Sequence, residues 1–272
     1  MNKHDIIREI RNKKSYLCTG LDTEMGKLPE HLSKNEEGFL RFNKEIIKAT
    51  SPYSVAYKIN TAFYEQYGAQ GWNWMEETLS YIPENTFTIA DAKRGDIGNT
   101  SKMYARAFFD NLNFDAITVS PYMGEDSIRP FLEFENKTII CLALTSNEGH
   151  KDFQTKQVNQ EKALYESVIE TVCKWGDENQ LMFVVGATRA EKVKEIRNLI
   201  PNHFLLVPGV GAQGGSLTDI THAAANTEVG LLVNSSRGII YASNGEGFAE
   251  AAGQSALKLS GEMSGFVEQY LV

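Results

Sequence analysis

Residues 86–100 read TFTIADAKRGDIGNT. The first five are β-branched, aromatic or small, which is typical of a buried strand, and charged residues follow at once. Because strand side chains alternate, the pattern places Asp91 and Lys93 on one face, and Gly95 allows a sharp turn before Asp96. Two opposite charges about 4 Å apart attract by roughly 4 kcal/mol at an effective dielectric near 20. The stretch predicts a strand that ends in a reaction centre, and a solvated loop with ordinary surface charges is the alternative.

Similar strand-sized apolar runs recur along the chain, and we count eight. They span 16–21, 54–59, 86–90, 116–120, 138–144, 181–186, 203–207 and 230–233. Helical apolar spacing occurs between and before these runs, at Ile6, Ile7 and Ile10, at Phe39, Phe42, Ile46 and Ile47, and at Leu164, Ile169 and Val172. Eight alternations of strand and helix favour an α/β fold of the closed (β/α)8 TIM barrel type, although an open doubly wound sheet has similar local patterns.

The composition fits one soluble domain. The chain has 272 residues, of which 42% are hydrophobic and 23% charged, and no linker or repeat divides residues 1–272. No apolar run approaches the roughly 20 residues that span a bilayer, and the first residues carry mixed charge, so we expect a cytoplasmic location. The formal net charge of −8 argues against a nucleic-acid partner bound through its backbone, but it allows one local phosphate pocket.

The cysteines and histidines lack the spacing of a metal site. Cys18, Cys141 and Cys173 are an odd number, and we expect reduced, buried thiols. The five histidines show no ligand spacing either, so the sequence predicts no metal site. The polar segment 146–160 follows the fifth run, where either a covering loop or a plain surface insertion fits.

Polar residues follow several predicted strands at the point where each strand ends. Asp22 follows the first run, Lys58 lies near the end of the second, and Thr145 and Ser146 follow the fifth. In a barrel, such residues gather at one rim and carry the chemistry. Each has a structural alternative, since an Asp can cap a turn, a Lys can extend to solvent and a Ser can bond the backbone. Their joint placement favours a site.

Two loops at the end of the chain are suited to phosphate. Residues 208–215, PGVGAQGG, expose backbone amides beside Gln213, and residues 234–238, NSSRG, supply the guanidinium group of Arg237. These loops follow the seventh and eighth runs, where barrels often bind phosphate, whereas Arg237 alone could form a surface salt bridge. The glycines also match a dinucleotide fingerprint, but the next strand leads to Asn234 rather than to an acidic residue, which disfavours that reading.

With these motifs together, the chain resembles the orotidine 5'-phosphate decarboxylase family, particularly its longer bacterial (type 2) branch. The motifs lie at residues 20–22, 57–60, 91–100, 145–147, 208–215 and 236–237. The resemblance implies decarboxylation of orotidine 5'-monophosphate (OMP) to UMP and carbon dioxide, the final step of de novo UMP biosynthesis. It implies no metal and no organic cofactor.

The resemblance also assigns roles to residues. The catalytic residues it implies are Lys58, Asp91, Lys93 and Asp96, and the substrate-binding residues are Asp22, Thr100, Thr145, Ser146, Gln213, Gly214 and Arg237. Lys93 would donate the proton to C6, and Asp91 would hold Lys93. Asp22 and Lys58 would bond the ribose, Ser146 the pyrimidine, and Gln213 and Arg237 the phosphate. A homodimer is implied, in which Asp96 and Thr100 enter the partner's site.

Two departures and two alternatives remain. Ile59 and Glu148 stand where many relatives have proline. A sugar-phosphate decarboxylase can carry a similar Asp-x-Lys-x-x-Asp core with a divalent metal, and chelator sensitivity would identify it. A noncatalytic nucleotide-binding protein would bind UMP without turnover.

Overall fold

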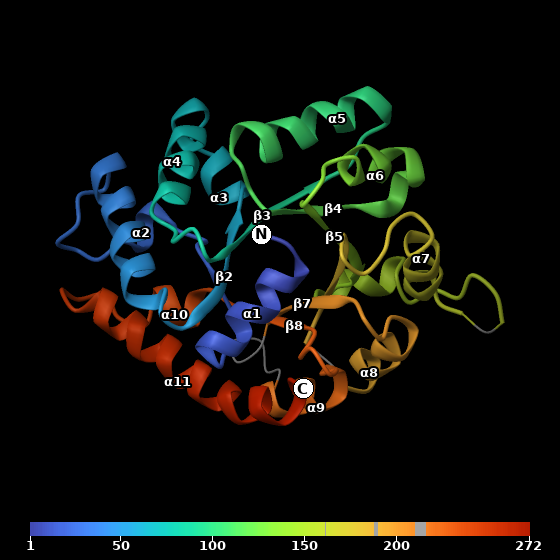
Figure 1. The fold of residues 1–272 in the computed structure, drawn as a ribbon. Coiled ribbons are helices and arrows are strands. Elements are labelled where there is room, and N and C mark those ends of the chain that lie inside the picture. The colour runs from blue at the N-terminus through green and yellow to red at the C-terminus, as the bar shows by residue number, and fades with distance from the viewer. Residues whose placement is uncertain (161, 188–189, 210–215) are drawn as a thin grey trace.

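A computed structural model describes residues 1–160, 162–187, 190–209 and 216–272. Within these residues, eight parallel strands pair in sequence order and close into a barrel, because β1 pairs with both β2 and β8 (Figure 1). The strands are β1 (Leu17–Gly20), β2 (Ser54–Asn60), β3 (Phe87–Arg94), β4 (Ala116–Val119), β5 (Thr138–Leu144), β6 (Leu181–Val185), β7 (Phe204–Pro208) and β8 (Leu231–Ser235). The predicted (β/α)8 barrel is confirmed, and the open sheet is wrong.

Each strand forms within or next to a predicted run, and β3 differs most from its prediction. It continues to Arg94 instead of ending at Ala90, because Asp91 still pairs with Asn60 of β2 and Arg94 with Val119 of β4. The first charged residues therefore belong to the barrel wall. β2 runs without interruption through Ile59, the position where many relatives have proline.

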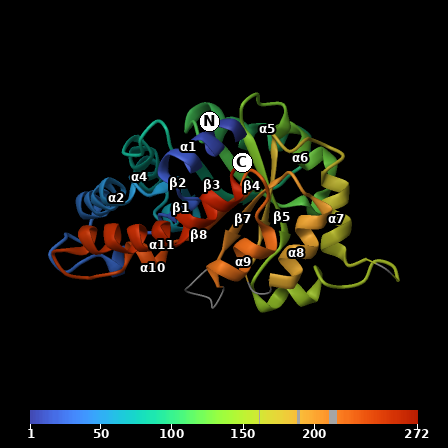
Figure 2. The same ribbon diagram turned by 60° about the horizontal axis from the view of Figure 1, so that its bottom comes forward.

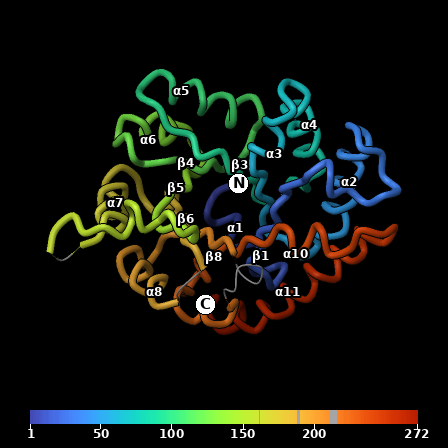
Figure 3. The backbone as a smooth tube through the Cα atoms, turned by 180° about the vertical axis from the view of Figure 1, so that it is seen from behind, coloured from blue at the N-terminus to red at the C-terminus, as the bar shows by residue number. Residues whose placement is uncertain are grey.

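Helices surround the strands as an outer ring, apart from the first helix, which lies across one end of the barrel (Figures 1 and 3). They are α1 (Lys3–Lys13), α2 (Glu36–Thr50), α3 (Ala62–Glu65), α4 (Ala69–Ser80), α5 (Gly98–Arg106), α6 (Glu125–Leu132), α7 (Leu164–Val172), α8 (Ala190–Leu199), α9 (Leu217–Ala224), α10 (Arg237–Ile240) and α11 (Phe248–Tyr270). The predicted helical segments are confirmed as α1, α2 and α7. In α2, Asn35 caps the start by accepting from Gly38 N, and the spacing of Phe39 and Phe42 buries both rings.

Helix α1 covers the mouth of the barrel at which the strands begin. Lys13 Nζ donates to Ser54 O at 2.7 Å, and the amino group of Met1 pairs with Asp115, directly before β4. Figure 1 shows α1 across the centre of the ring. Because this mouth is covered, the ends of the strands at the opposite mouth are the available place for a site.

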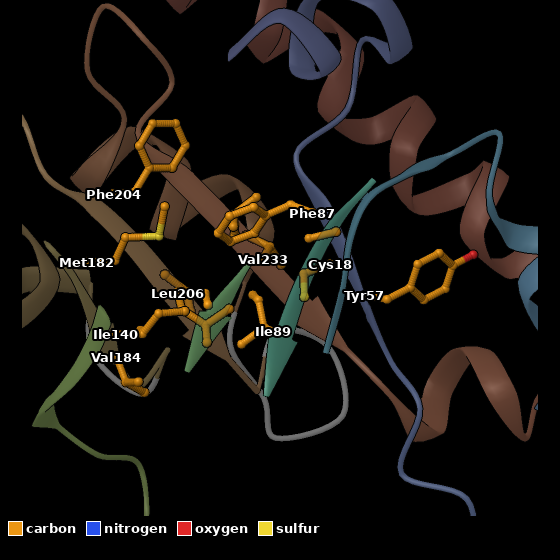
Figure 4. Close-up of a cluster of buried hydrophobic side chains, with 14 of the residues drawn as sticks. Cys18, Tyr57, Phe87, Ile89, Ile140, Met182, Val184, Phe204, Leu206 and Val233 are labelled. Atoms are coloured by element: carbon orange, nitrogen blue, oxygen red, sulfur yellow. The ribbon is translucent and has the colours of Figure 1, made fainter. Parts of the chain in front are cut away.

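The barrel interior is an apolar core that stops just below the charged residues. Figure 4 shows Phe87 and Ile89 inside a cluster with side chains from β6, β7 and β8, while Tyr57 points away from it. The Tyr57 hydroxyl instead donates to Ile47 O of α2 at 3.1 Å. Asp91 follows Ile89 by two residues, so strand alternation carries it to the same inner face, one layer nearer the open mouth.

The remaining elements close the outside of the barrel. Helix α11 packs against α2 and runs beside α10 (Figure 2). Cys18 and Cys141 are buried and Cys173 is partly buried, and all three are free thiols, which confirms reduced cysteines with two of them fully buried. In the described part of the chain, none of the helices has both the length and the apolar character needed to cross a membrane.

Candidate active site

Lys58 lies at the centre of a buried charge network where β2 ends. Its Nζ is 3.1 Å from Asp91 Oδ2 and 3.4 Å from Asp22 Oδ1, and its side chain is 6% exposed. Strand register explains the meeting, because Lys58 pairs with Gly20 of β1 and the chain reaches Asp22 two residues later. The lysine is therefore held between two carboxylates in a place that water hardly reaches.

Asp91 joins this lysine to Lys93. Lys93 Nζ is 2.5 Å from Asp91 Oδ1, which also accepts from Thr118 Oγ1 at 3.0 Å. The predicted contact is confirmed, but regular alternation does not produce it. The pairing of β3 with β4 shifts between Ala90 and Arg94, and Lys93 has a φ of 48°. A non-glycine residue in this left-handed region is strained. The Thr118 hydroxyl stabilises the bulge by accepting from Lys93 N at 2.9 Å.

The network keeps its charges ionised. Burial alone would raise the pKa of Asp91, but the ammonium groups of Lys58 and Lys93 outweigh burial and lower that pKa to about 2. Burial would lower the pKa of Lys58, yet Asp91 and Asp22 raise it above its ordinary value. The carboxylate and the buried ammonium group are both charged at neutral pH.

Arg94 holds the end of β3 from outside the network. It pairs with Glu65 of α3, and its guanidinium lies 5.5 Å from the ring centres of both Tyr104 and Phe108. Its Nη1 donates to Ala92 O at 3.0 Å, inside the Asp91–Lys93 segment. The arginine thus connects the strained segment to the helices on either side.

β3 ends directly before Gly95, and this glycine does not adopt a left-handed conformation. The left-handed conformations lie at Lys93 and at Gly98, which has a φ of 48°. Gly95 instead allows a close approach, since a Cβ there would lie 3.1 Å from Ser120 O. The backbone irregularity that the structure shows therefore lies within β3, before Gly95.

A cavity of about 200 Å³ opens beside the network. It is lined by Asp22, Lys58, Asn60, Asp91, Pro208, Gly209, Asn234, Ser235, Ser236 and Arg237. The structure thus brings together predicted residues from four strand ends, with the exposed Arg237 at the side formed by β8 and α10. Asn60 and Asn234 were not among the predicted site residues, although both are polar residues at the end of a strand. Thr118 was also missed, because a lone threonine in an apolar run carries no local signal.

Other predicted residues lie elsewhere in the described structure. Asp96 bonds within its own segment, where its Oδ1 accepts from Ile97 N at 2.7 Å, and Thr100 is exposed on α5. Neither is among the residues that line the cavity. Within one chain, Asp96 and Thr100 are therefore not joined to the other predicted residues. Gln213 and Gly214 lie outside the described residues.

Thr145 and Ser146 line a second cavity, of about 140 Å³, at the ends of β5 and β6. A Cβ on Gly186 would lie 2.7 Å from Ser146 N, so the glycine lets the two loops meet. Thr145 N donates to Gln154 Oε1 at 2.8 Å, which ties the first part of the segment 146–160 to the end of β5. Glu148 begins a short 3-10 helix, Glu148–Asp152, in this segment. The later part of the segment projects outward beside α7 (Figure 1), as a surface insertion does.

Comparisons with known proteins agree with this geometry. The model of the "Orotidine 5'-phosphate decarboxylase / HUMPS family" matches residues 15–252. The orotidine 5'-phosphate decarboxylase of Phocaeicola vulgatus is 54% identical over 266 residues, covering 97% of this chain and 98% of that one. The Flavobacterium johnsoniae enzyme of the same name is 54% identical over 271 residues, covering 98% and 99%. The solved Leishmania donovani OMP decarboxylase has 35% identity and a TM-score of 0.85 over 98% of both chains. The chain belongs to the orotidine 5'-phosphate decarboxylase / HUMPS family.

Proposed function

We propose that this chain decarboxylates OMP to UMP with the Asp22, Lys58, Asp91 and Lys93 network as its reaction centre. The reaction, which belongs to pyrimidine nucleotide biosynthesis, follows from family membership and from the relatives at 54% identity. One observation carries the assignment of roles: Asp91 is held ionised between two ammonium groups beside a cavity. The residue roles below are our proposal.

Lys93 stabilises the charge that develops during the reaction. When the bond between C6 and the carboxylate breaks, the electron pair stays on C6 and carbon dioxide leaves. The Lys93 ammonium group, half-exposed and held by Asp91, stabilises this carbanion and transfers its proton to C6. The resulting neutral amine then takes a proton from solvent. Asp91 holds the ammonium group in place before the substrate arrives, so little reorganisation is needed during the reaction.

The two cavities divide the substrate between them. Arg237 binds the phosphate, with Gln213 and Gly214 assigned to the same group on the sequence motif. Asp22 and Lys58 bond ribose hydroxyls at the centre of the first cavity. Ser146 bonds the pyrimidine edge from the second cavity, and Thr145 supports that loop through its hydroxyl, which donates to Asn147 Oδ1 at 2.6 Å.

We also propose a homodimer in which Asp96 and Thr100 complete the partner's site. Exposed apolar side chains near these residues support an interface: Ile97 is 55% exposed and Tyr122 is 85% exposed. Burying exposed apolar side chains against another chain removes them from water, which favours association.

Subunit mixing tests the shared site. Lys93→Ala and Asp96→Asn chains, each inactive alone, would regenerate one intact site per heterodimer. After confirmed subunit exchange, activity should reach about a quarter of the wild-type value at equal mixing, because half of the dimers are mixed and each has one of two sites. Activity that stays at the level of the separate variants would refute sharing.

Independence from metal distinguishes this proposal from a metal-dependent sugar-phosphate decarboxylase. We expect turnover of OMP to continue in EDTA. Loss of activity in EDTA, with recovery on adding Mg²⁺, would favour the sugar-phosphate alternative. We further propose that residues 1–272 form one cooperative domain in the cytoplasm, which a single unfolding transition and cell fractionation would test.

A further inference from the structure

The short helix α10 joins the predicted phosphate side of the cavity to the loop that carries Asp22. Arg237 begins the helix and lines the cavity, while Tyr241 is its C-cap residue. The helix also contacts β1 and α11. Each end of the helix therefore contacts a segment that is connected to Asp22: the start contacts the end of β1, and the other end contacts the loop that follows β1.

The first contact lies at the start of α10. A Cβ on Gly20 would overlap Ser236 Oγ, so only a glycine at the end of β1 lets Ser236 rest there. Asn234 Nδ2 donates to the same hydroxyl at 3.3 Å. The residue before Arg237 is thereby fixed against the strand that leads, two residues later, to Asp22.

The second contact lies at the other end of the helix. The Tyr241 hydroxyl accepts from Glu24 N at 2.7 Å and donates to Asp22 O at 3.3 Å. Burial raises the pKa of Tyr241, so the hydroxyl is protonated and can donate. Its ring stacks on Phe42 with centres 5.8 Å apart. Two bonds from one hydroxyl therefore set the backbone from which the Asp22 carboxylate reaches Lys58.

We propose that Tyr241 is a positioning residue that couples phosphate binding at Arg237 to the placement of Asp22 and, through it, Lys58. This rests on the proposed phosphate role of Arg237. A phosphate group that holds Arg237 restrains α10, and the Tyr241 hydroxyl passes that restraint to the Asp22 loop. Binding energy from the remote phosphate then helps to order the reaction centre.

Other bonds keep the loop folded when the Tyr241 hydroxyl is removed. Tyr64 OH donates to Leu21 O at 3.2 Å, and Thr23 Oγ1 donates to Asn43 Oδ1 at 2.6 Å. These anchors come from α3 and α2 rather than from α10. A Tyr241→Phe chain should therefore fold and keep the ring packing, while it loses the link between α10 and Asp22.

A double-mutant cycle on kcat/KM for OMP tests the coupling, using wild type, Tyr241→Phe, Arg237→Ala and the double variant. We expect Tyr241→Phe, which removes both bonds of the hydroxyl, to lower kcat/KM about fivefold to tenfold. Arg237→Ala should lower it about 100-fold, and Tyr241→Phe should then add less than about twofold. If the double variant instead loses the product of the two single reductions in kcat/KM, the residues act independently. That result would overturn the coupling and leave the proposed phosphate role of Arg237 intact.

A matched control is Tyr16→Phe, which removes a buried hydroxyl that bonds to Thr221 of α9 at 2.6 Å rather than to the Asp22 loop. Its effect on kcat/KM should be under about twofold in either background. An Arg237→Ala chain with wild-type kinetics would refute the proposed phosphate role and the coupling together. An equal loss for Tyr16→Phe and Tyr241→Phe would show that the effect is general destabilisation, and would overturn the proposal.

Discussion

Replacing Asp91 with asparagine tests the electrostatics of the reaction centre. The substitution keeps the size of the side chain and an oxygen for the Thr118 hydroxyl, but it removes the charge between Lys58 and Lys93. Asp91 is 12% exposed, so solvent screens the loss only weakly. We expect a less stable protein and a much slower enzyme.

The magnitude follows from the pKa and from burial. The pKa of Asp91 is about 2 against an ordinary value of 3.8. At about 1.36 kcal/mol per pKa unit, the carboxylate contributes about 2 kcal/mol. The variant also leaves buried Lys58 with one carboxylate, Asp22, at 3.4 Å. Since breaking a buried pair costs about 3–5 kcal/mol, we expect a total loss of about 3 kcal/mol and a Tm lower by about 6–12 °C.

The stability difference should depend on pH in a defined direction. Because folding lowers the pKa of Asp91, its contribution is present above the unfolded pKa of 3.8 and is lost as pH falls toward about 2. Folding raises the pKa of Lys58, so that contribution is present below about pH 10 and is lost only at higher pH. The difference should stay constant between about pH 5 and 9 and shrink by about 1 kcal/mol at pH 3.

Urea unfolding of wild type and Asp91→Asn at pH 7 and at pH 3 measures this difference, and OMP turnover at pH 7 measures the catalytic loss. We expect kcat to fall at least about 100-fold. Asp110→Asn, at an exposed carboxylate, is a matched control that should change stability by less than about 0.5 kcal/mol. A variant as stable as wild type, or more stable, would refute the argument, because desolvation would then exceed the attraction within the network.

Three further substitutions test the supports of the site. Gly20→Ala should lower kcat/KM by more than about tenfold and cost about 1–3 kcal/mol, because its methyl group displaces Ser236; wild-type kinetics would contradict this contact. Thr118→Val removes two bonds in the Asp91–Lys93 bulge and should reduce kcat about tenfold with a small change in KM, whereas a change confined to KM would count against a positioning role. Arg94→Met should reduce kcat about tenfold. Arg94→Lys should be equally slow, since an ammonium group cannot reproduce the planar stacking on Tyr104 and Phe108. Wild-type kcat in Arg94→Lys would refute a role for this stacking.

The barrel was predictable because its signals are local. Each strand is a short apolar run, and the helical spacing of Phe39 and Phe42 identifies α2 without any tertiary information. The charged end of β3 was predictable for the same reason, since Asp91 and Lys93 follow a buried strand directly. Their contact is confirmed, although the bulge that produces it depends on a register shift against β4 that the sequence of β3 does not contain.

Contacts between residues that lie far apart along the chain could not be predicted from the sequence. Thr118 reaches Asp91 only because β4 lies beside β3, and Tyr241 reaches Asp22 across 219 residues. Neither side chain belongs to a motif. Asp96 shows that membership in a motif does not by itself place a residue at the site: it belongs to the charged motif but bonds within its own segment. A role in the partner's site is a property of an assembly, so only the mixed-subunit experiment tests it.

We propose that Lys93 carries out a decarboxylation that needs no metal. The most direct measurement follows the ultraviolet spectrum of OMP with purified protein in EDTA, beside a Lys93→Ala chain, with the product identified by chromatography. We expect UMP formation by wild type and almost none by the variant. Undiminished turnover by folded Lys93→Ala chains, or no turnover by folded wild type until a divalent metal is added, would contradict it.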